Sequence, residues 1–87
     1  MPRAFIPAQL RDLTGGRAEI DVAGASVREV VAALDGQFPG LAGRLCQAGE
    51  LSPALQVSID GMLSRRGLDA KVPAASEVHF LPIFGGG

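Results

Sequence analysis

Residues 26–37 read SVREVVAALDGQ, and this stretch decides the fold because it carries the main helix pattern of the sequence. Ser26 is a favourable N-cap, and Glu29 three positions later completes a Ser-x-x-Glu capping box. Aliphatic residues recur at i, i+3, i+4 and i+7 and draw one apolar stripe: Val27, Val30, Val31 and Leu34. Pro39 favours a stop, since proline disfavours helical backbone at the residue before it. The pattern predicts a helix from about Val27 to Gln37 that buries one face.

Two strand-like segments precede this helix. Residues 3–7, RAFIP, read as a short first strand, with Pro7 at its end or on an edge because proline cannot donate to a sheet ladder. Residues 17–22, RAEIDV, alternate polar and apolar, which places Ala18, Ile20 and Val22 on one face of a second strand. Residues 8–13 are expected to be irregular or one helical turn, and the Thr-Gly-Gly run after them is a turn signal. An antiparallel hairpin is therefore expected at the start of the domain.

More strand patterns follow the helix. Residues 40–48 suggest a second helical turn, and residues 55–59, LQVSI, alternate again. The following Asp60-Gly61 pair is among the strongest short hairpin signals, so residues 62–64 are expected to return as a strand. Residues 65–67, RRG, read as a solvated basic turn, with a partner contact as the second interpretation. Residues 68–73 are expected to be irregular, with room for a 3₁₀ turn.

Residues 77–84, EVHFLPIF, form the last predicted strand, with Val78 and Phe80 on one face and His79 and Leu81 on the other. One helix packed on a mixed sheet of about five strands is an α+β two-layer sandwich. A β-grasp arrangement is the natural candidate for this order of elements, and in it the first and last strands lie side by side in the sheet centre. We expect a β-grasp domain over residues 1–84 and a flexible glycine tail over residues 85–87.

Bulk properties exclude several classes of function. The net charge of −1 argues against a nucleic-acid binder, which normally shows a basic face. No apolar run approaches the roughly 18–20 residues that span a bilayer, and no secretion signal is visible. A single cysteine, Cys46, forms no internal disulfide, so a cytoplasmic location is expected, and Cys46 reads as a small, half-buried hydrophobe. One His and one Cys make a metal site of N and S ligands improbable, so neither a metal nor a bound cofactor is expected.

The chain ends on residues 81–87, LPIFGGG. Glycine lacks a Cβ, so such a tail can thread a narrow channel and present its terminal carboxylate to the active site of another protein. Two other interpretations are a frayed terminus and a vector-derived remnant.

Nearly the whole chain resembles the ubiquitin-like sulfur carrier family, which includes the small subunit of molybdopterin synthase and carriers of the thiamine and cysteine pathways. The similarity is carried, in order, by residues 8–16, 26–34, 38–41, 57–61 and 77–82 and by the terminal glycines: AQLRDLTGG, SVREVVAAL, FPGL, VSIDG and EVHFLP. This family usually ends on two glycines after a small or β-branched residue, whereas three follow Phe84 here.

The resemblance implies a co-substrate rather than an enzyme. An E1-like adenylyltransferase would use MgATP to adenylate the carboxylate of Gly87, and a sulfurtransferase or another sulfide donor would convert it to a thiocarboxylate. The acceptor would be a synthase, either the large subunit of molybdopterin synthase or a cysteine synthase. In this scheme Gly85 and Gly86 let the tail extend into the active site of the partner. Leu81 and Phe84 anchor the tail to the partner where it leaves the domain.

A partner is expected to dock on the sheet edge and on apolar residues that we expect to be exposed, because apolar surface patches tend to mark interfaces. The candidate partner-binding residues are Ile6, Arg11, Leu63, Leu81 and Phe84.

The pathway stays open at this stage. Residues 8–13 look like the molybdopterin type, and the Ile-Pro pair with Thr-Gly-Gly looks like the cysteine type. The thiamine type ranks third, and a carrier for a secondary metabolite or thionucleoside is a further possibility. Two other classes of function compete: a protein modifier joined to lysines through Gly87, and a passive β-grasp interaction module.

Overall fold

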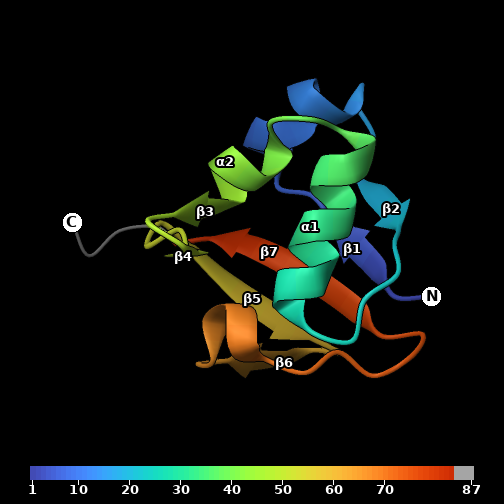
Figure 1. The fold of residues 1–87 in the computed structure, drawn as a ribbon, viewed down its shortest axis with the longest axis vertical. Coiled ribbons are helices and arrows are strands. Elements are labelled where there is room, and N and C mark those ends of the chain that lie inside the picture. Colours follow the sequence, from blue (N-terminus) through green and yellow to red (C-terminus); the bar gives the residue numbers. More distant parts are fainter. Residues whose placement is uncertain (84–87) are drawn as a thin grey trace.

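The structure, a computed structural model, describes residues 1–83 and contains a five-stranded mixed sheet with helices packed on one face (Figure 1). The sheet order is β2-β1-β7-β5-β6. The strands of this sheet are β1 (Arg3–Phe5), β2 (Glu19–Asp21), β5 (Leu55–Ile59), β6 (Met62–Ser64) and β7 (Glu77–Pro82). A separate small hairpin joins β3 (Cys46–Gln47) to β4 (Glu50–Leu51). The helices are α1 (Val27–Gln37) and α2 (Leu41–Leu45), with 3₁₀ turns η1 (Ala8–Thr14) and η2 (Gly67–Asp69).

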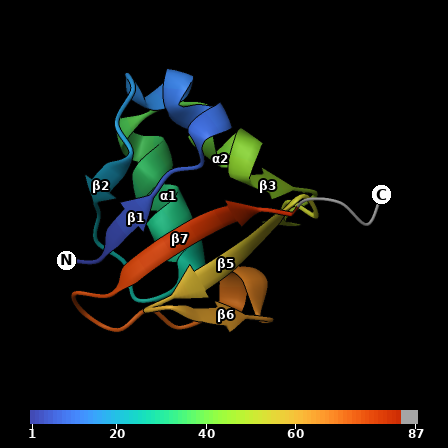
Figure 2. The same cartoon turned by 180° about the vertical axis from the view of Figure 1, so that it is seen from behind.

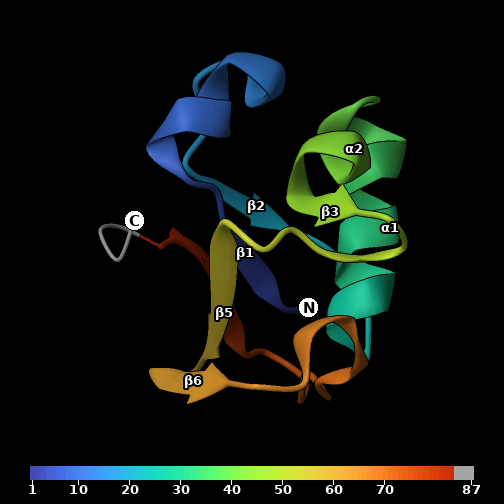
Figure 3. The ribbon, with the colours of Figure 1, turned by 90° about the vertical axis from the view of Figure 1, so that its left-hand side faces the viewer.

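The predicted β-grasp architecture is confirmed. Strand β1 pairs antiparallel with β2 and parallel with β7, while β5 pairs antiparallel with both β7 and β6. The first and last strands therefore lie side by side near the middle of the sheet, as expected. In Figure 3 the sheet is seen nearly edge-on, with α1, α2 and η2 on one side of it.

Helix α1 spans the predicted residues and buries the predicted stripe. The N-terminus of α1 forms one of the two hydrogen bonds of a standard capping box: the Glu29 N–H donates to Ser26 Oγ at 3.2 Å. The Glu29 carboxylate accepts from the Ala25 N–H at 2.9 Å, one residue earlier than in the standard box. Both contacts satisfy donors around the first turn that the helix itself cannot pair.

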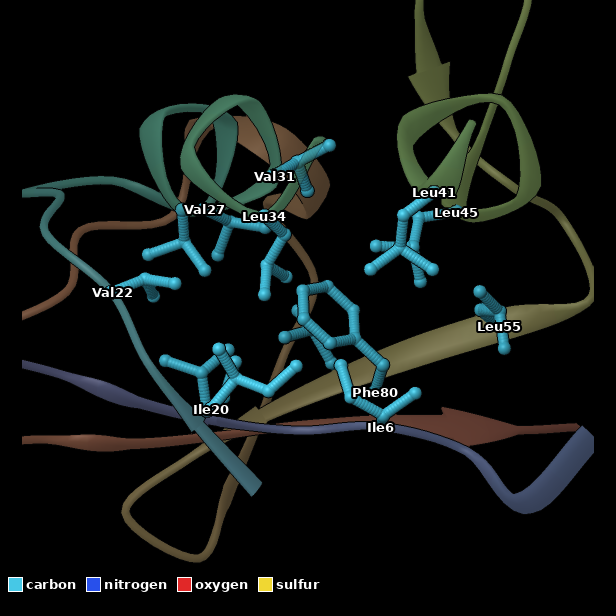
Figure 4. Packing of buried hydrophobic residues seen from close by; sticks show 14 of the residues in the cluster. Ile6, Ile20, Val22, Val27, Val31, Leu34, Leu41, Leu45, Leu55 and Phe80 are labelled. Carbon is cyan, nitrogen blue, oxygen red and sulfur yellow. The ribbon is translucent and has the colours of Figure 1, made fainter. Parts of the chain in front are cut away.

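The core lies between α1 and the inner face of the sheet (Figure 4). Its fully buried members from the strands include Ile20, Val57, Val78 and Phe80. Helix α2 adds Leu41 and Leu45 and is held by α1, because one carboxylate oxygen of Asp35 accepts from the N–H groups of Gly40 (3.1 Å) and Ala42 (3.0 Å). An acidic side chain at a helix N-terminus also interacts favourably with the helix dipole.

Three features differ from the sequence prediction. Three strands are shorter than expected: β1 ends at Phe5, β2 covers only Glu19–Asp21, and β7 ends at Pro82. Pairing of β1 with β7 stops at Phe5 and His79, whereas β5 pairs with β7 up to Pro82. Residues 8–14 form a 3₁₀ helix of about two turns, longer than the single irregular or helical turn that was predicted for residues 8–13. The β3–β4 hairpin was not predicted. Its strands have two residues each, too few for alternation to register, and its turn uses positive φ at Ala48 and Gly49.

Among residues 1–83, no helix has the length and apolar character needed to cross a bilayer.

Candidate functional site

Strand β7 fixes where the chain's C-terminal residues leave the domain. It is held on both sides: Phe5 of β1 pairs with His79, and Gln56 of β5 pairs with Leu81. A central strand cannot move without breaking two ladders of hydrogen bonds, so its end has a defined position and direction. The described chain stops one residue beyond β7, at Ile83, which is half-exposed.

The last step of β7 is still anchored by backbone hydrogen bonding. The Ile83 N–H donates to the carbonyl of Ala54 at 2.8 Å. Because donors alternate sides along a strand, the nitrogen of Pro82 points away from β5, towards the side where β1 has already ended. A proline is therefore accommodated here without loss of a ladder bond, and the backbone is held up to Ile83.

The other end of β7 is fastened by Asp60, in the turn between β5 and β6. One carboxylate oxygen accepts from the Glu77 N–H at 2.9 Å, and the other accepts from the Ser76 hydroxyl at 2.8 Å. These two hydrogen bonds to the ionised form, that from Glu77 first, hold the pKa of Asp60 below its usual value. Asp60 also donates its own N–H to the Glu77 carbonyl at 2.9 Å. Three hydrogen bonds therefore join this turn to the start of β7.

The face of the sheet turned away from α1 is visible in Figure 2. Its middle carries a stacked pair, the rings of Phe5 and His79, whose centroids lie 4.0 Å apart at an angle of 4°. His79 Nε2 also lies 3.5 Å from a carboxylate oxygen of Glu77. Leu81 continues the same face along β7, and Leu63 of β6 lies two strands away, with Ser58 of β5 between it and His79.

We call Phe5, His79, Leu81 and Leu63 the outer patch. Leu63 is 61% exposed, and the other three are partly exposed. The predicted exposure of Leu63 is thus confirmed, and Leu81 reaches the surface in part. The ring stack was not predicted from the sequence. Phe5 and His79 come together only through the parallel register of β1 and β7, for which the sequence carries no local signal.

The expectation that Ile6 is exposed is wrong. Only 2% of this residue is accessible, and Figure 4 shows it beside Phe80, in the core. Strand alternation is the reason: Ala4 faces inward, Phe5 faces outward, and Ile6 returns to the inner face. Ile6 cannot contact a partner while the domain is folded.

Arg11 is half-buried and makes hydrogen bonds within the domain. Its Nε donates to the Ile6 carbonyl at 3.1 Å, and its own carbonyl accepts from the Gly16 N–H at 2.7 Å. The buried hydroxyl of Thr14 lies 2.8 Å from the Arg17 carbonyl and closes the same turn. These bonds fix η1 against the end of β1; whether Arg11 also contacts a partner stays a prediction.

The predicted reacting residue Gly87, the reach residues Gly85 and Gly86, and the predicted anchor Phe84 lie outside the described residues. Within residues 1–83, no cluster of three or more His, Cys, Asp or Glu side chains is placed to hold a metal ion. Cys46 is half-buried beside the core, as predicted. Desolvation raises the pKa of its thiol, an effect that the positive charge of Arg28 partly offsets.

The comparisons with known proteins agree with this geometry. The pattern of the ThiS family matches residues 5–87. Among curated protein sequences, none matches the chain.

Two similar solved structures are CysO proteins. CysO in the BexX/CysO complex of Amycolatopsis orientalis is 28% identical with a TM-score of 0.91, and the alignment covers 100% of both chains. CysO of Mycobacterium tuberculosis is 24% identical with a TM-score of 0.88, over 97% of this chain and 100% of that one.

A third similar structure is SAMP1 from Haloferax volcanii, at 29% identity and a TM-score of 0.74, over 99% of this chain and 98% of that one. The family match runs from the end of β1 through the terminal glycines. The chain therefore belongs to the ThiS family of ubiquitin-like sulfur carriers, whose members are co-substrates and not catalysts.

Proposed function

We propose that Gly87 is the reacting residue of this carrier. A terminal carboxylate oxygen of Gly87 attacks the α-phosphate of ATP in a partner's active site, pyrophosphate leaves, and an acyl-adenylate forms. A sulfide sulfur then attacks the carbonyl carbon, AMP leaves, and the chain ends in a thiocarboxylate. Adenylation is needed because the oxygen of a free carboxylate is a very poor leaving group, whereas AMP is a good one.

The observation that carries this proposal is the position of β7. A central strand, hydrogen-bonded up to Ile83, immediately precedes the residues Phe84-Gly85-Gly86-Gly87 in the sequence. Four residues span at most about 14 Å, so the tail can reach a buried reaction site only if the domain docks close to its mouth. The outer patch, which includes the predicted docking residues Leu63 and Leu81, lies on the sheet that carries this strand.

In this proposal the described residues of the carrier provide a docking surface and take no part in the chemical steps. His79, the single histidine of the chain, is stacked on Phe5, and the acidic side chain near it, Glu77, lies at the opposite end of β7 from the exit. The proposal therefore assigns MgATP, the general base and the sulfide donor to an E1-like adenylyltransferase and a sulfurtransferase. The carrier binds no cofactor of its own in this scheme, and the reactions take place in the cytoplasm.

For the acceptor we favour the cysteine-synthesis type over the molybdopterin type. Two CysO structures match with TM-scores of 0.91 and 0.88, over nearly the full length of both chains. The chain's Ile6-Pro7 and Thr14-Gly15-Gly16 motifs point the same way. The test is to give the thiocarboxylate form to a cysteine synthase and to the large subunit of molybdopterin synthase. With the true acceptor and its substrate, the thiocarboxylate sulfur attacks an electrophilic carbon and a thioester adduct forms on the carrier; hydrolysis of the thioester by water then returns the carrier to its unmodified mass. The thiocarboxylate mass should therefore disappear only with the true acceptor.

The reaction itself is tested by intact mass. The protein is incubated with its adenylating enzyme, MgATP and a sulfide source. A gain equal to the difference between one sulfur and one oxygen atom is expected, and deletion of Gly87 abolishes it. No gain with an adenylating enzyme that releases pyrophosphate on another carrier would rule the proposal out.

A second candidate function is protein modification through Gly87. It is favoured by the similarity to SAMP1, which the solved structures describe as a small archaeal modifier protein. The same activation would end in an isopeptide bond to a lysine of a target. Immunoblots of native cells distinguish the two: ladders of conjugates that vanish when Gly87 is deleted support modification, and a single free species supports sulfur transfer alone.

A further inference from the structure

Two hollows adjoin on the helix side of the molecule, away from the outer patch. One measures about 240 Å³ and the other about 230 Å³, and both are lined by Arg28 of α1 and Leu68 of η2. Figures 1 and 3 show the elements that form them, α1, η2 and the β3–β4 hairpin, on the same side of the sheet. Since they share two walls, we treat them as one groove, which we call the helix-side groove.

One half of the groove is polar and cationic. Three guanidinium groups line it, those of Arg28, Arg65 and Arg66, against the carboxylates of Glu50 and Asp69. Arg28 is oriented by an ion pair with Asp69, 2.9 Å from Nη2 to Oδ1. Among residues 1–83, neither Arg65 nor Arg66 has a carboxylate within ion-pair distance. This half is therefore locally positive in a chain whose net charge is −1.

The other half is apolar. Its walls are Val31 and Ala32 of α1, Ala42 of α2, and Cys46 and Gly49 of the β3–β4 hairpin. Ala32 is exposed, while Ala42 and Cys46 are half-buried. At about 230 Å³, the hollow has room for a side chain and not for a folded element.

The partition between the two halves is fixed by η2. Leu68 is 8% exposed and anchors this turn in the core, and the Asp69 N–H donates to the Arg66 carbonyl at 2.9 Å. Gly67 adopts a φ of +54°, and a Cβ at this position would lie 3.9 Å from the Leu51 side chain. The turn therefore holds Arg66 at the rim while Leu68 separates the cationic half from the apolar half.

We propose that the helix-side groove binds an extended segment of a partner protein in which apolar side chains are followed closely by carboxylates. The apolar half takes the aliphatic side chain, and Arg65 and Arg66 pair with the carboxylates, which matches charge to charge across the contact. A free inorganic anion would use the cationic half alone and leave the apolar half empty. This inference is independent of the chemistry at Gly87, because it concerns the opposite side of the sheet.

The test is an NMR titration of the full-length, ¹⁵N-labelled protein at low ionic strength. The probe is a capped hexapeptide of two leucines followed by four glutamates. Amide signals of Leu51, Gly67, Leu68 and Gly49 are expected to shift in a saturable way. Salt should weaken the binding, because ions screen exposed charges beyond about 10 Å at 0.1 M.

Three variants sharpen the test. Reversing both free arginines (R65E with R66E) should weaken binding about tenfold or more, which corresponds to roughly 1.4 kcal/mol. Glu50→Gln should strengthen binding, since it removes a repelling carboxylate from the groove. Arg17→Glu is the control: it reverses one exposed arginine between η1 and β2, half of the charge change in the double variant, and should leave the affinity unchanged.

Three results would overturn the proposal. The first is the absence of saturable shifts with millimolar peptide. The second is equal binding of a peptide whose leucines are replaced by serine, or equal shifts with inorganic phosphate, since either would make the groove a general anion site. The third is an equal loss of affinity in the Arg17 control, which would show that only net charge matters.

Discussion

Asp60 is a single side chain on which the position of β7 depends. Its carboxylate accepts from the Glu77 N–H and the Ser76 hydroxyl, and both bonds favour the ionised form. Its pKa in the folded chain is therefore below that in the unfolded chain. The stabilisation is present above the unfolded pKa and is lost as the pH falls through the folded one.

We expect Asp60→Asn to lower the urea midpoint at neutral pH, with the difference from the original protein shrinking towards pH 3. Asparagine tolerates the positive φ of this turn, 51°, so the substitution changes charge and not backbone. Urea unfolding curves at several pH values measure how this difference in midpoint depends on pH, with Asp12→Asn at an exposed site as the control. A difference that stays constant with pH would contradict the assignment.

Single residues also show where sequence reasoning stops. The exposure of Leu63 could be predicted from its hairpin, whereas that of Ile6 was misjudged. Alternation from Ala4 would have placed Ile6 inward, but the proline after it hid how far the strand pattern extends. The Phe5–His79 stack needs the register of two strands that are distant in sequence, and no local pattern supplies that register.

Helix α1 is the element that the sequence specifies most completely. Its bounds, its cap and its buried stripe were all predicted, because capping and the 3.6-residue period are local properties. Helix α2 was foreseen from Leu41 and Leu45. The β3–β4 hairpin was not, since its strands are too short to carry a pattern.

Two glycines near α1 should respond in opposite ways to alanine. A Cβ at Gly24 would lie 2.9 Å from the Val30 nitrogen and 3.1 Å from the Glu29 carbonyl carbon, both in the backbone of the first helical turn. We expect Gly24→Ala to destabilise the domain by about 1–3 kcal/mol, as overpacking does.

Gly36, inside the last turn of the same helix, is the matched comparison. A Cβ there meets nothing within 4 Å, so Gly36→Ala should stabilise by about 0.5–1 kcal/mol through the lower entropy of the unfolded chain. Urea unfolding of both variants measures whether each substitution raises or lowers the free energy of unfolding. A loss of stability in Gly36→Ala, or none in Gly24→Ala, would show that α1 is packed differently.

At the scale of the molecule, the two faces of the sheet have different roles. The inner face packs in the core, and the outer face carries the outer patch. Residues of β6 allow this to be tested, because Met62 and Leu63 are neighbours, both exposed, that point to opposite faces. Leu63→Glu should raise the KM for the adenylating enzyme about tenfold, equivalent to roughly 1.4 kcal/mol. Met62→Glu makes the same change on the other face and should have little effect.

Thermal unfolding serves as the check that both β6 variants remain folded to the same degree. Equal KM values for Leu63→Glu and Met62→Glu would remove the outer patch as a docking surface, while leaving the reaction at Gly87 untouched.

The pairing of the first and last strands in the sheet centre could be predicted from the order of elements, because a β-grasp leaves few ways to bury one amphipathic helix. The helix-side groove could not be predicted. Its walls come from α1, α2, the β3–β4 hairpin and η2, and their meeting depends on the whole packed chain. The basic residues 65–67 were recognised as a turn, but the hollow beside them is a tertiary property.

The parallel pairing of β1 with β7 has a consequence for synthesis on the ribosome. Arg3 pairs with Glu77, and the elements from η1 to η2 all lie between them in the sequence. Contacts between segments so distant form late and slow folding. A nascent chain cannot complete its sheet until β7 has left the exit tunnel. An activating enzyme that docks on the outer patch would therefore not recognise chains that lack β7, since Phe5 and His79 come together only after both strands have been translated.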